Sequence, residues 1–426
     1  MPLDRFQEVL PDDDLAELRE AAERGREALD GHAVLHVNST ARGGGVAEML
    51  GALLPYAQGA GVDARWLVIE GDEDFFAVTK RVHNLLHGDE GDGGELGDAE
   101  REAYERALEP NAKELTEIVE EGDLVVLHDP QTAGLIPALK PTGARIVWRC
   151  HVGLDTPNDN ARRAWAFLLP YVQEADAYVF SRDAFVWEDL DRDRGAIIAP
   201  SIDAFAPKNQ ELADDVVDAI LAAAGIVDAE AQAAPEFTRM DRETAAVEHT
   251  ADIVEERPLS PEDRYVLQVS RWDRLKDPLG VIAGFAEHVA PHTDAHLVYA
   301  GPAVEAVSDD PEGAKVLEQA KEQWHELPDE TRERVHLALL PMDDLEENAA
   351  IVNALQRRAA VVVQKSLAEG FGLTVAEAMW KGRPVVASRI GGIQDQIEDG
   401  TSGWSAPARA APRCSTCAST RRTSPR

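Results

Sequence analysis

Short apolar runs alternate with helical patterns along this chain, and the alternation limits the folds open to it. Apolar runs of strand length that end in polar residues occupy positions 33–38, 66–71, 123–129, 145–151 and 177–181. The pattern then restarts, with further runs at positions 265–271, 296–302, 335–341, 359–365 and 384–390. Strands that alternate with helices form parallel sheets covered on both faces. We therefore predict an α/β protein with two such units, in which ligands bind beyond the carboxyl ends of the strands.

The two blocks predict an N-terminal domain over residues 1–207 and a C-terminal domain over residues 208–404. An acidic, alanine-rich stretch joins them, and its first part has a helical pattern. Residues 225–260 contain few large apolar side chains, so we expect an insertion there that is partly helical or disordered. The last segment, 405–426, contains five arginines and no acidic residue, which predicts a disordered tail or a segment read out of frame.

The chain carries 42 basic and 79 acidic residues, a net charge of −37. So acidic a protein repels nucleic acid and anionic membranes, because both are bound through cationic patches. Concentrated salt screens this self-repulsion, so we expect a salt-accumulating halophile as the source. The N-terminus lacks the basic and apolar regions of a signal peptide, and no apolar run is long enough to span a membrane. We therefore expect a cytoplasmic protein.

Two clusters suit the binding of phosphate groups. Gly44 and Gly45 follow a predicted strand and open a helix, where glycines allow close backbone approach and the helix N-terminus attracts anions. A plain strand–helix turn is the alternative. Arg271 and Lys276 end the first strand of the second block, where two cations in an acidic chain favour a diphosphate ligand. A surface ion-pair network with neighbouring aspartates is the alternative there.

A third cluster lies in the segment 365–378, where a predicted strand leads into a loop bracketed by glycines. A helix is predicted to start near Leu373 or Thr374, so the backbone N–H groups of Gly372, Leu373 and Thr374 would face an anion. Glu369 and Glu377 lie eight residues apart, about 12 Å along a helix. That exceeds the separation of glycosidase carboxylates, about 5 to 9.5 Å. We therefore expect the two to bind different hydroxylated parts of one ligand, the alternative being solvated acidic residues.

Two histidines end predicted strands of the first block. The His128-Asp129 pair ends the run at 123–129, and His151 ends the run at 145–151. Both are expected at the ligand-facing edge of the first sheet, although a structural role for either histidine remains the alternative. The three cysteines, Cys150, Cys414 and Cys417, predict neither a disulfide framework nor a zinc site.

Together these clusters resemble the family 4 retaining glycosyltransferases, which have the GT-B fold of two Rossmann-like domains facing a cleft. The Glu369-to-Glu377 element within SLAEGFGLTVAEAM carries the resemblance most clearly, and SRWDRLKD supplies an Arg-plus-Lys element upstream. A narrower resemblance, to trehalose glycosyltransferring synthases, covers about 30–404 apart from 225–260. Its segments are HVNSTARGGGVAEML, DEDFFAVTKRVHNLLHG, VVLHDPQTAGLIP, VWRCHVGLD, APSIDAFAPKN and LEENAAIVNALQRRA.

The resemblance implies a retaining transfer of glucose from a nucleoside-diphosphate (NDP) glucose to free glucose, forming trehalose. Arg271 and Lys276 would bind the donor diphosphate, Glu377 the ribose, and Glu369 with the backbone of Gly370, Phe371 and Gly372 the donor glucose. His151 would contact the reacting sugar, and Asp129 would bind the acceptor. The residues implied in catalysis are His151, Arg271, Lys276 and Glu369. The other implied contacts to the sugar nucleotide are Gly44, Gly45, Leu340, Leu373 and Thr374.

The resemblance implies no metal and no separate cofactor, and it leaves a homodimer open. Three other activities remain as alternatives: a trehalose phosphorylase, another family 4 hexosyltransferase, and an inactive protein that binds sugar nucleotides. The ADP, UDP and GDP forms of the donor are equally open. Family members end in helices that cross back onto the first domain, whereas this chain has the atypical tail, so we expect a destabilised fold.

Overall fold

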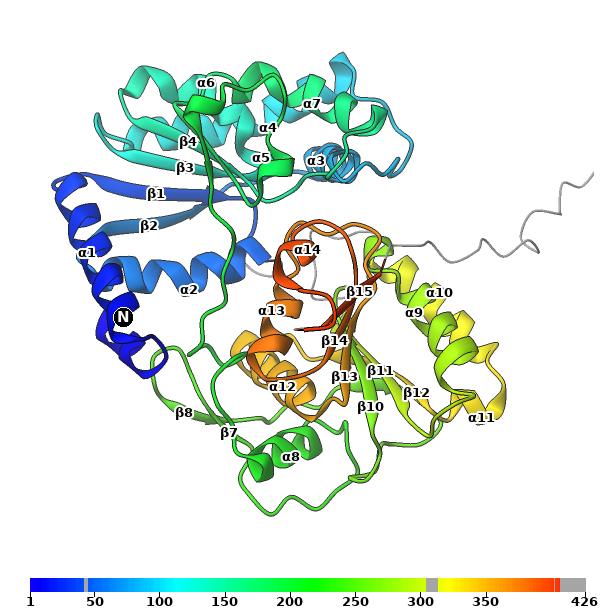
Figure 1. The fold of residues 1–426 in the computed structure, drawn as a ribbon. Coiled ribbons are helices and arrows are strands. Elements are labelled where there is room, and N and C mark those ends of the chain that lie inside the picture. Colours follow the sequence, from blue (N-terminus) through cyan, green and yellow to red (C-terminus); the bar gives the residue numbers. More distant parts are fainter. Residues whose placement is uncertain (42–44, 304–312, 402, 407–426) are drawn as a thin grey trace, which may run out of the picture.

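The computed structural model describes residues 1–41, 45–303, 313–401 and 403–406. Its first sheet has the strand order β2-β1-β3-β4-β5-β6, and every pairing in it is parallel. The strands are β1 (Ala33–Asn38), β2 (Asp63–Val68), β3 (Leu124–His128), β4 (Arg145–Cys150), β5 (Ala177–Phe180) and β6 (Gly195–Ile197). The helices are α1 (Asp12–Ala28), α2 (Gly45–Gly59), α3 (Glu73–Leu86), α4 (Asp98–Ile118), α5 (Asp129–Thr132), α6 (Ile136–Leu139) and α7 (Asp159–Val172). This domain is the upper one in Figure 1.

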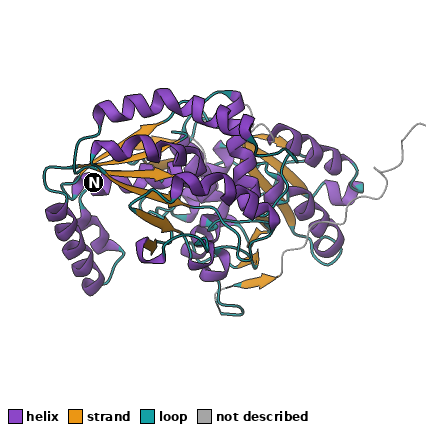
Figure 2. Cartoon of the chain, turned by 90° about the horizontal axis from the view of Figure 1, so that it is seen from above, coloured by secondary structure: helices purple, strands orange, loops and turns teal. Residues whose placement is uncertain are grey.

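The second sheet has the order β15-β14-β13-β10-β11-β12-β9, and only β9 in it runs antiparallel to its neighbour. Its strands are β9 (Asp252–Val254), β10 (Tyr265–Val269), β11 (His296–Pro302), β12 (Val335–Leu340), β13 (Val361–Gln364), β14 (Val385–Ser388) and β15 (Trp404–Ala406). The helices of this half are α8 (Asp214–Ala223), α9 (Pro278–Gly284), α10 (Gly313–His325), α11 (Asp329–Arg332), α12 (Leu345–Arg358), α13 (Leu373–Trp380) and α14 (Ile393–Gln396). Helices lie over the strands (Figure 2), and helices and strands alternate along the chain in both halves, which confirms the predicted fold class.

Apolar side chains of the strands explain why the layers form. In the first domain, Leu35 and Leu127 point into a core where Phe75 of α3 and Tyr104 of α4 stack at 5.6 Å between ring centroids. Both faces of a parallel sheet are buried, so its strands are nearly continuous apolar runs. Polar residues gather instead where the strands end.

Two predictions need correction: the position of one strand, and the helical or disordered state of the stretch 225–260. The strand predicted at 66–71 lies at Asp63–Val68, because Asp63 pairs with Ala33 and the charged side chains of Asp63 and Arg65 point to solvent as an ion pair on this edge strand. The stretch 225–260 is not helical or disordered over residues 236–254. It holds the hairpin β7 (Glu236–Thr238) and β8 (Thr244–Ala246), followed by β9. Buried Phe237 in this stretch joins the core of the second domain.

Ser405 and Ala406, the first residues of the predicted tail, belong to strand β15, whereas 407–426, with Cys414 and Cys417, lie outside the described residues. Within the described ranges, no helix is long and apolar enough to cross a membrane.

Candidate functional site

The loops that follow strands of the two sheets contact each other across the domain interface. Arg182, after β5, pairs with Asp395 of α14, with 2.8 Å between Nε and Oδ2. Asp155, after β4, accepts a hydrogen bond of 2.7 Å from the Gln394 side-chain amide and one of 3.1 Å from the Gly391 backbone N–H. In Figure 1, α13 and α14 lie on the side of the second domain that faces the first. The interface therefore joins the sheet edges where ligands of such folds bind.

Lys276 and Glu369, predicted to act on one substrate, are in direct contact. Lys276 lies in the turn after β10 and Glu369 in the loop after β13. The Lys276 Nζ donates to Glu369 Oε2 at 2.6 Å. Glu369 Oε2 also accepts from the Ser366 hydroxyl at 3.1 Å. Burial alone would raise the pKa of Glu369, but Lys276 and the Ser366 hydroxyl hold it below its ordinary value. Glu369 is therefore an anion beside a cation, an arrangement that suits polar sugar and phosphate groups.

Arg271, the second predicted diphosphate ligand, lies beside a buried aspartate. Its Nη2 is 3.7 Å from Asp273 Oδ2, and Lys80 Nζ of α3 in the first domain is also 3.7 Å from that oxygen. Burial would raise the pKa of Asp273, but Lys80 and Arg271 lower it below its ordinary value. Lys80, Arg271 and Lys276 thus gather positive charge where the two domains meet.

The glycine-bracketed loop delivers the start of α13 to the first domain. The helix begins at Leu373, as predicted, after Gly372 with a left-handed φ of 86°. A Cβ on Gly370 would lie 2.5 Å from the carbonyl oxygen of His151. One on Gly45, the first residue of α2, would lie 3.8 Å from Leu373 Cδ1. Two helix N-termini, one from each domain, therefore meet at the interface. Gly44 lies outside the described residues.

Asp129 and His151 form one unit at the edge of the first sheet. The backbone N–H of His151 donates to Asp129 Oδ1 at 2.7 Å. Asp129 has a φ of 63°, and the indole N–H of Trp148 donates to its backbone carbonyl at 3.0 Å. Burial raises the pKa of Asp129 to about 7, whereas burial and then Arg149 lower the pKa of His151 to about 3.

Glu377 and Leu340 are both buried in the second domain. Glu377, 4% exposed, accepts from the Gln356 side-chain amide at 3.2 Å and lies 3.8 Å from Lys208 Nζ. Lys208 also pairs with Glu48 of α2 at 2.6 Å, so it links the two domains. Leu340, at the end of β12, is buried in the second core. Glu369 and Glu377 have different partners, and their binding to different parts of one ligand stays a prediction.

One face of α3, together with the end of this helix, completes the interface. The sequence analysis assigned no role to these residues. His83 and His87 have their ring centroids 4.8 Å apart, and burial lowers the pKa of both rings, that of His87 to about 4. The His87 Nδ1 is buried without a hydrogen-bond partner among the described residues. Lys80, His83 and His87 recur at helical spacing, a signal that could have identified this face.

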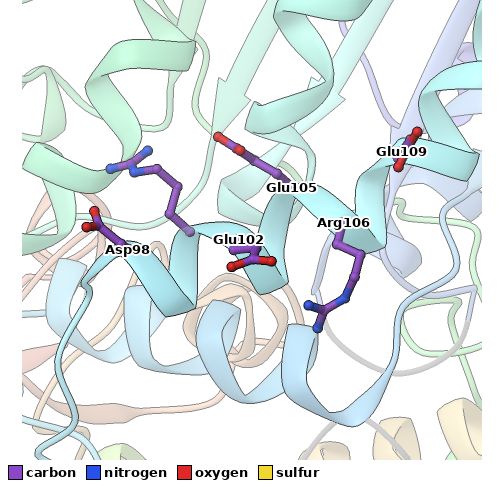
Figure 3. A pocket seen from close by; sticks show the side chains of 6 residues that line it. Asp98, Glu102, Glu105, Arg106 and Glu109 are labelled. Atoms are coloured by element: carbon purple, nitrogen blue, oxygen red, sulfur yellow. The ribbon is translucent and has the colours of Figure 1, made fainter.

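A depression of about 510 Å³ lies elsewhere, on the charged surface of α4 (Figure 3). It contains none of the predicted site residues. Its lining side chains are Asp98, Arg101, Glu102, Glu105, Arg106 and Glu109.

Asp129 makes the stability of the folded chain depend on pH. A carboxyl whose pKa rises from 3.8 to about 7 on folding holds its proton more tightly in the folded state. The free energy of unfolding is therefore expected to fall as the pH rises through this window. Asp129→Asn, which keeps an oxygen for the His151 N–H, should flatten that fall in urea unfolding below and above the window. Asp123→Asn, at another buried carboxylate that accepts backbone N–H bonds, is the control and should keep the wild-type slope. An equal slope in Asp129→Asn would contradict the assignment.

Comparison with known proteins places this geometry in a family. The profile of the trehalose synthase N-terminal domain matches residues 36–187, and that of glycosyl transferases group 1 matches residues 250–413. The trehalose synthase of Pyrococcus horikoshii is 34% identical over 402 residues, which cover 94% of this chain and 83% of that protein. The trehalose synthase of Rubrobacter xylanophilus is 37% identical over 388 residues, covering 90% and 80%.

The fold agrees with solved structures. The α,α-trehalose-phosphate synthase (UDP-forming) from Burkholderia xenovorans, in complex with glucose-6-phosphate, matches with a TM-score of 0.60. The match covers 88% of each chain at 14% identity, so it shows the shared GT-B fold alone. Sequence identity above 30% over most of both chains shows more: this protein is a glycosyltransferase, and it belongs to the trehalose synthase family.

Proposed function

We propose that this chain transfers glucose from an NDP-glucose to free glucose, with retention of configuration, and so forms trehalose. The contact between Lys276 and Glu369 carries the proposal, because it joins a cation for the diphosphate to a carboxylate for the sugar. The Gly370 loop beside them touches His151 of the first domain. Sequence similarity to trehalose synthases supports the choice of product.

Charge on the leaving group is the main demand of this reaction. As the bond between glucose C1 and the diphosphate oxygen breaks, negative charge grows on the diphosphate. Arg271, Lys276 and the N-terminus of α13 would stabilise that charge. Because these groups supply the stabilisation, we propose that no metal and no separate cofactor is needed.

The remaining residues would orient the two sugars. Glu369 and the backbone of residues 370–372 would hold the donor glucose, and His151 would contact it from the other domain. Asp129 would bind the acceptor, and Glu377 the ribose, near Leu340 at the base. In front-face attack, the acceptor oxygen bonds to C1 while its proton passes to the departing diphosphate oxygen. Contact between the two domains would exclude water and so limit hydrolysis.

Product analysis by NMR tests the proposal. The chain is incubated in concentrated KCl with glucose and a mixture of ADP-, UDP- and GDP-glucose, because salt screens its net charge of −37. An α,α-1,1-linked glucose disaccharide is expected, and it would establish both acceptor and retention. Free NDP without disaccharide would contradict the acceptor. A parallel incubation replaces the sugar nucleotides with glucose 1-phosphate. Disaccharide and free phosphate in that incubation alone would identify a phosphorylase instead.

A further inference from the structure

Three histidines, buried His36 and His128 and half-buried His151, form a continuous chain that ends at the interface. His36 of β1 and His128 of β3 are joined Nδ1 to Nε2 at 3.0 Å. His128 and His151 are joined in the same sense, Nδ1 to Nε2, at 3.3 Å. The ring planes are inclined by only 28° and 10° along the chain, with centroids 5.3 and 5.6 Å apart. The rings therefore follow one another head to tail.

Each ring carries a single proton near neutral pH. Burial, followed by the Arg149 guanidinium, lowers the pKa of His36 to about 4 and that of His151 to about 3. Burial and the neighbouring rings lower the pKa of His128 well below its ordinary value. A neutral imidazole has one N–H donor and one acceptor nitrogen. Each of the two contacts therefore needs its proton from one ring only.

Two arrangements of the ring protons satisfy both contacts. If His128 carries its proton on Nε2, it donates to His36, and His151 must donate to His128 from its own Nε2. If His128 carries its proton on Nδ1, it donates to His151, and His36 must donate from its own Nδ1. Because both junctions join Nδ1 to Nε2, all three rings have the same tautomer in either arrangement.

We propose that His36 and His128 are positioning residues that couple the tautomer of His151 to their own, so that the polarity of its Nδ1 is set by the three rings together. A proton on Nδ1 would make it a donor to a sugar hydroxyl, and a proton on Nε2 would make it an acceptor. The backbone of His151 lies against the Gly370 loop, which places the end of the chain beside the donor side of the site. The catalytic value of this arrangement rests on the proposed function, whereas the shared tautomer does not.

Nitrogen-15 NMR of the imidazole rings in the full chain tests the proposal without substrate. Protonated and unprotonated ring nitrogens have well-separated shifts, and the signals are assigned by single-site variants. One shared tautomer for His36, His128 and His151 is expected in the wild type. Different tautomers among the three rings would overturn the proposal.

The variant His36→Leu removes the first hydrogen bond of the chain. His128 Nε2 then loses its ring partner, so the tautomer balance of His128, and with it that of His151, should differ from that of the wild type. We expect kcat about tenfold lower, on the scale of one lost hydrogen bond. An unchanged His151 tautomer in a folded His36→Leu protein would overturn the proposal. If trehalose is not the product, the NMR result on the tautomers remains valid, and only the proposed catalytic role of the arrangement is contradicted.

A second histidine pair provides a matched control in the other domain. His296 Nδ1 and His336 Nε2 are 2.9 Å apart, and both residues are buried. His336 Nδ1 contacts Glu255 at 2.7 Å. His336→Leu should cost similar thermal stability but leave the His151 tautomer unchanged. A His151 shift of equal size in His336→Leu would mean that the His36→Leu effect is general loosening of the fold, and would overturn the proposal.

Discussion

Replacing Lys276 with alanine is expected to lower kcat for glucosyl transfer by about 100- to 1000-fold, the effect of removing one preorganised donor from a site that stabilises developing charge. The Lys276 ammonium is 19% exposed and lies 2.6 Å from Glu369 at the interface. Without it, negative charge on the departing diphosphate loses one of the two cations proposed to stabilise it. Steady-state kinetics should show the loss mainly in kcat, with a smaller change in the KM for glucose.

Binding measurements separate this role from a structural one. The wild type is expected to bind a nucleoside diphosphate more tightly than the monophosphate, and Lys276→Ala should lose most of that preference. Lys140→Ala removes a lysine–carboxylate pair, at 2.5 Å from Asp176, that lies on the first domain and is exposed. It should leave the preference intact. An unchanged preference in Lys276→Ala would remove this residue from the diphosphate site. The thermal unfolding of Lys276→Ala should be measured beside its kinetics, because this variant leaves the Glu369 carboxylate buried without its cation, which lowers stability.

The architecture could be predicted because its signals are local. Most strands of the two sheets, which are parallel apart from β9, are short apolar runs, and each such run ends where the chain turns polar. The start of α13 at Leu373 was predicted for the same reason, since Gly372 permits the left-handed turn that precedes it. Such features depend on a few adjacent residues, so one sequence is enough to locate them.

Features that depend on distant partners were missed or misplaced. Phe237 orders the acidic stretch by packing into the second core, although its neighbours are mostly small or charged. Lys80 meets Asp273 across the interface, 193 positions along the chain, at 3.7 Å. No pattern within either segment indicates its partner. The resemblance to a known family assigned Lys276 and Glu369 to one donor substrate, but their direct contact at 2.6 Å was not predicted.

The histidines show the same limit from another side. The sequence placed His128 and His151 at the ends of strands but gave no sign that they line up with His36. Only the order of strands β1, β3 and β4 brings the three rings into line. That order comes from crossover connections between parallel strands, which a single sequence does not reveal. The shared sense of the two junctions, Nδ1 to Nε2, is likewise a property of the fold.

Gly370→Ala is expected to lower kcat by about 100-fold while leaving each domain folded. The added Cβ would lie 2.5 Å from the His151 carbonyl oxygen, a backbone atom that cannot rotate away. The Gly370 loop and the segment after β4 must therefore separate. Both carry proposed contacts to the reacting sugar, and a misplacement of about 1 Å is enough to cost a factor of about 100.

A comparison of glycine positions shows whether the interface is the cause. Gly284→Ala, at the end of α9, would place its Cβ in open space, with no heavy atom within 4 Å. It should therefore keep wild-type kinetics and unfolding. Gly370→Ala should unfold near the wild-type temperature, since the atom it strikes belongs to the other domain and neither core changes. Raising the donor concentration should not reduce the kinetic defect of Gly370→Ala. Only reversion of residue 370 to glycine should reduce it. Wild-type kcat in Gly370→Ala would mean that the contact between Gly370 and His151 opens during turnover, and that the sugar is held by the second domain alone.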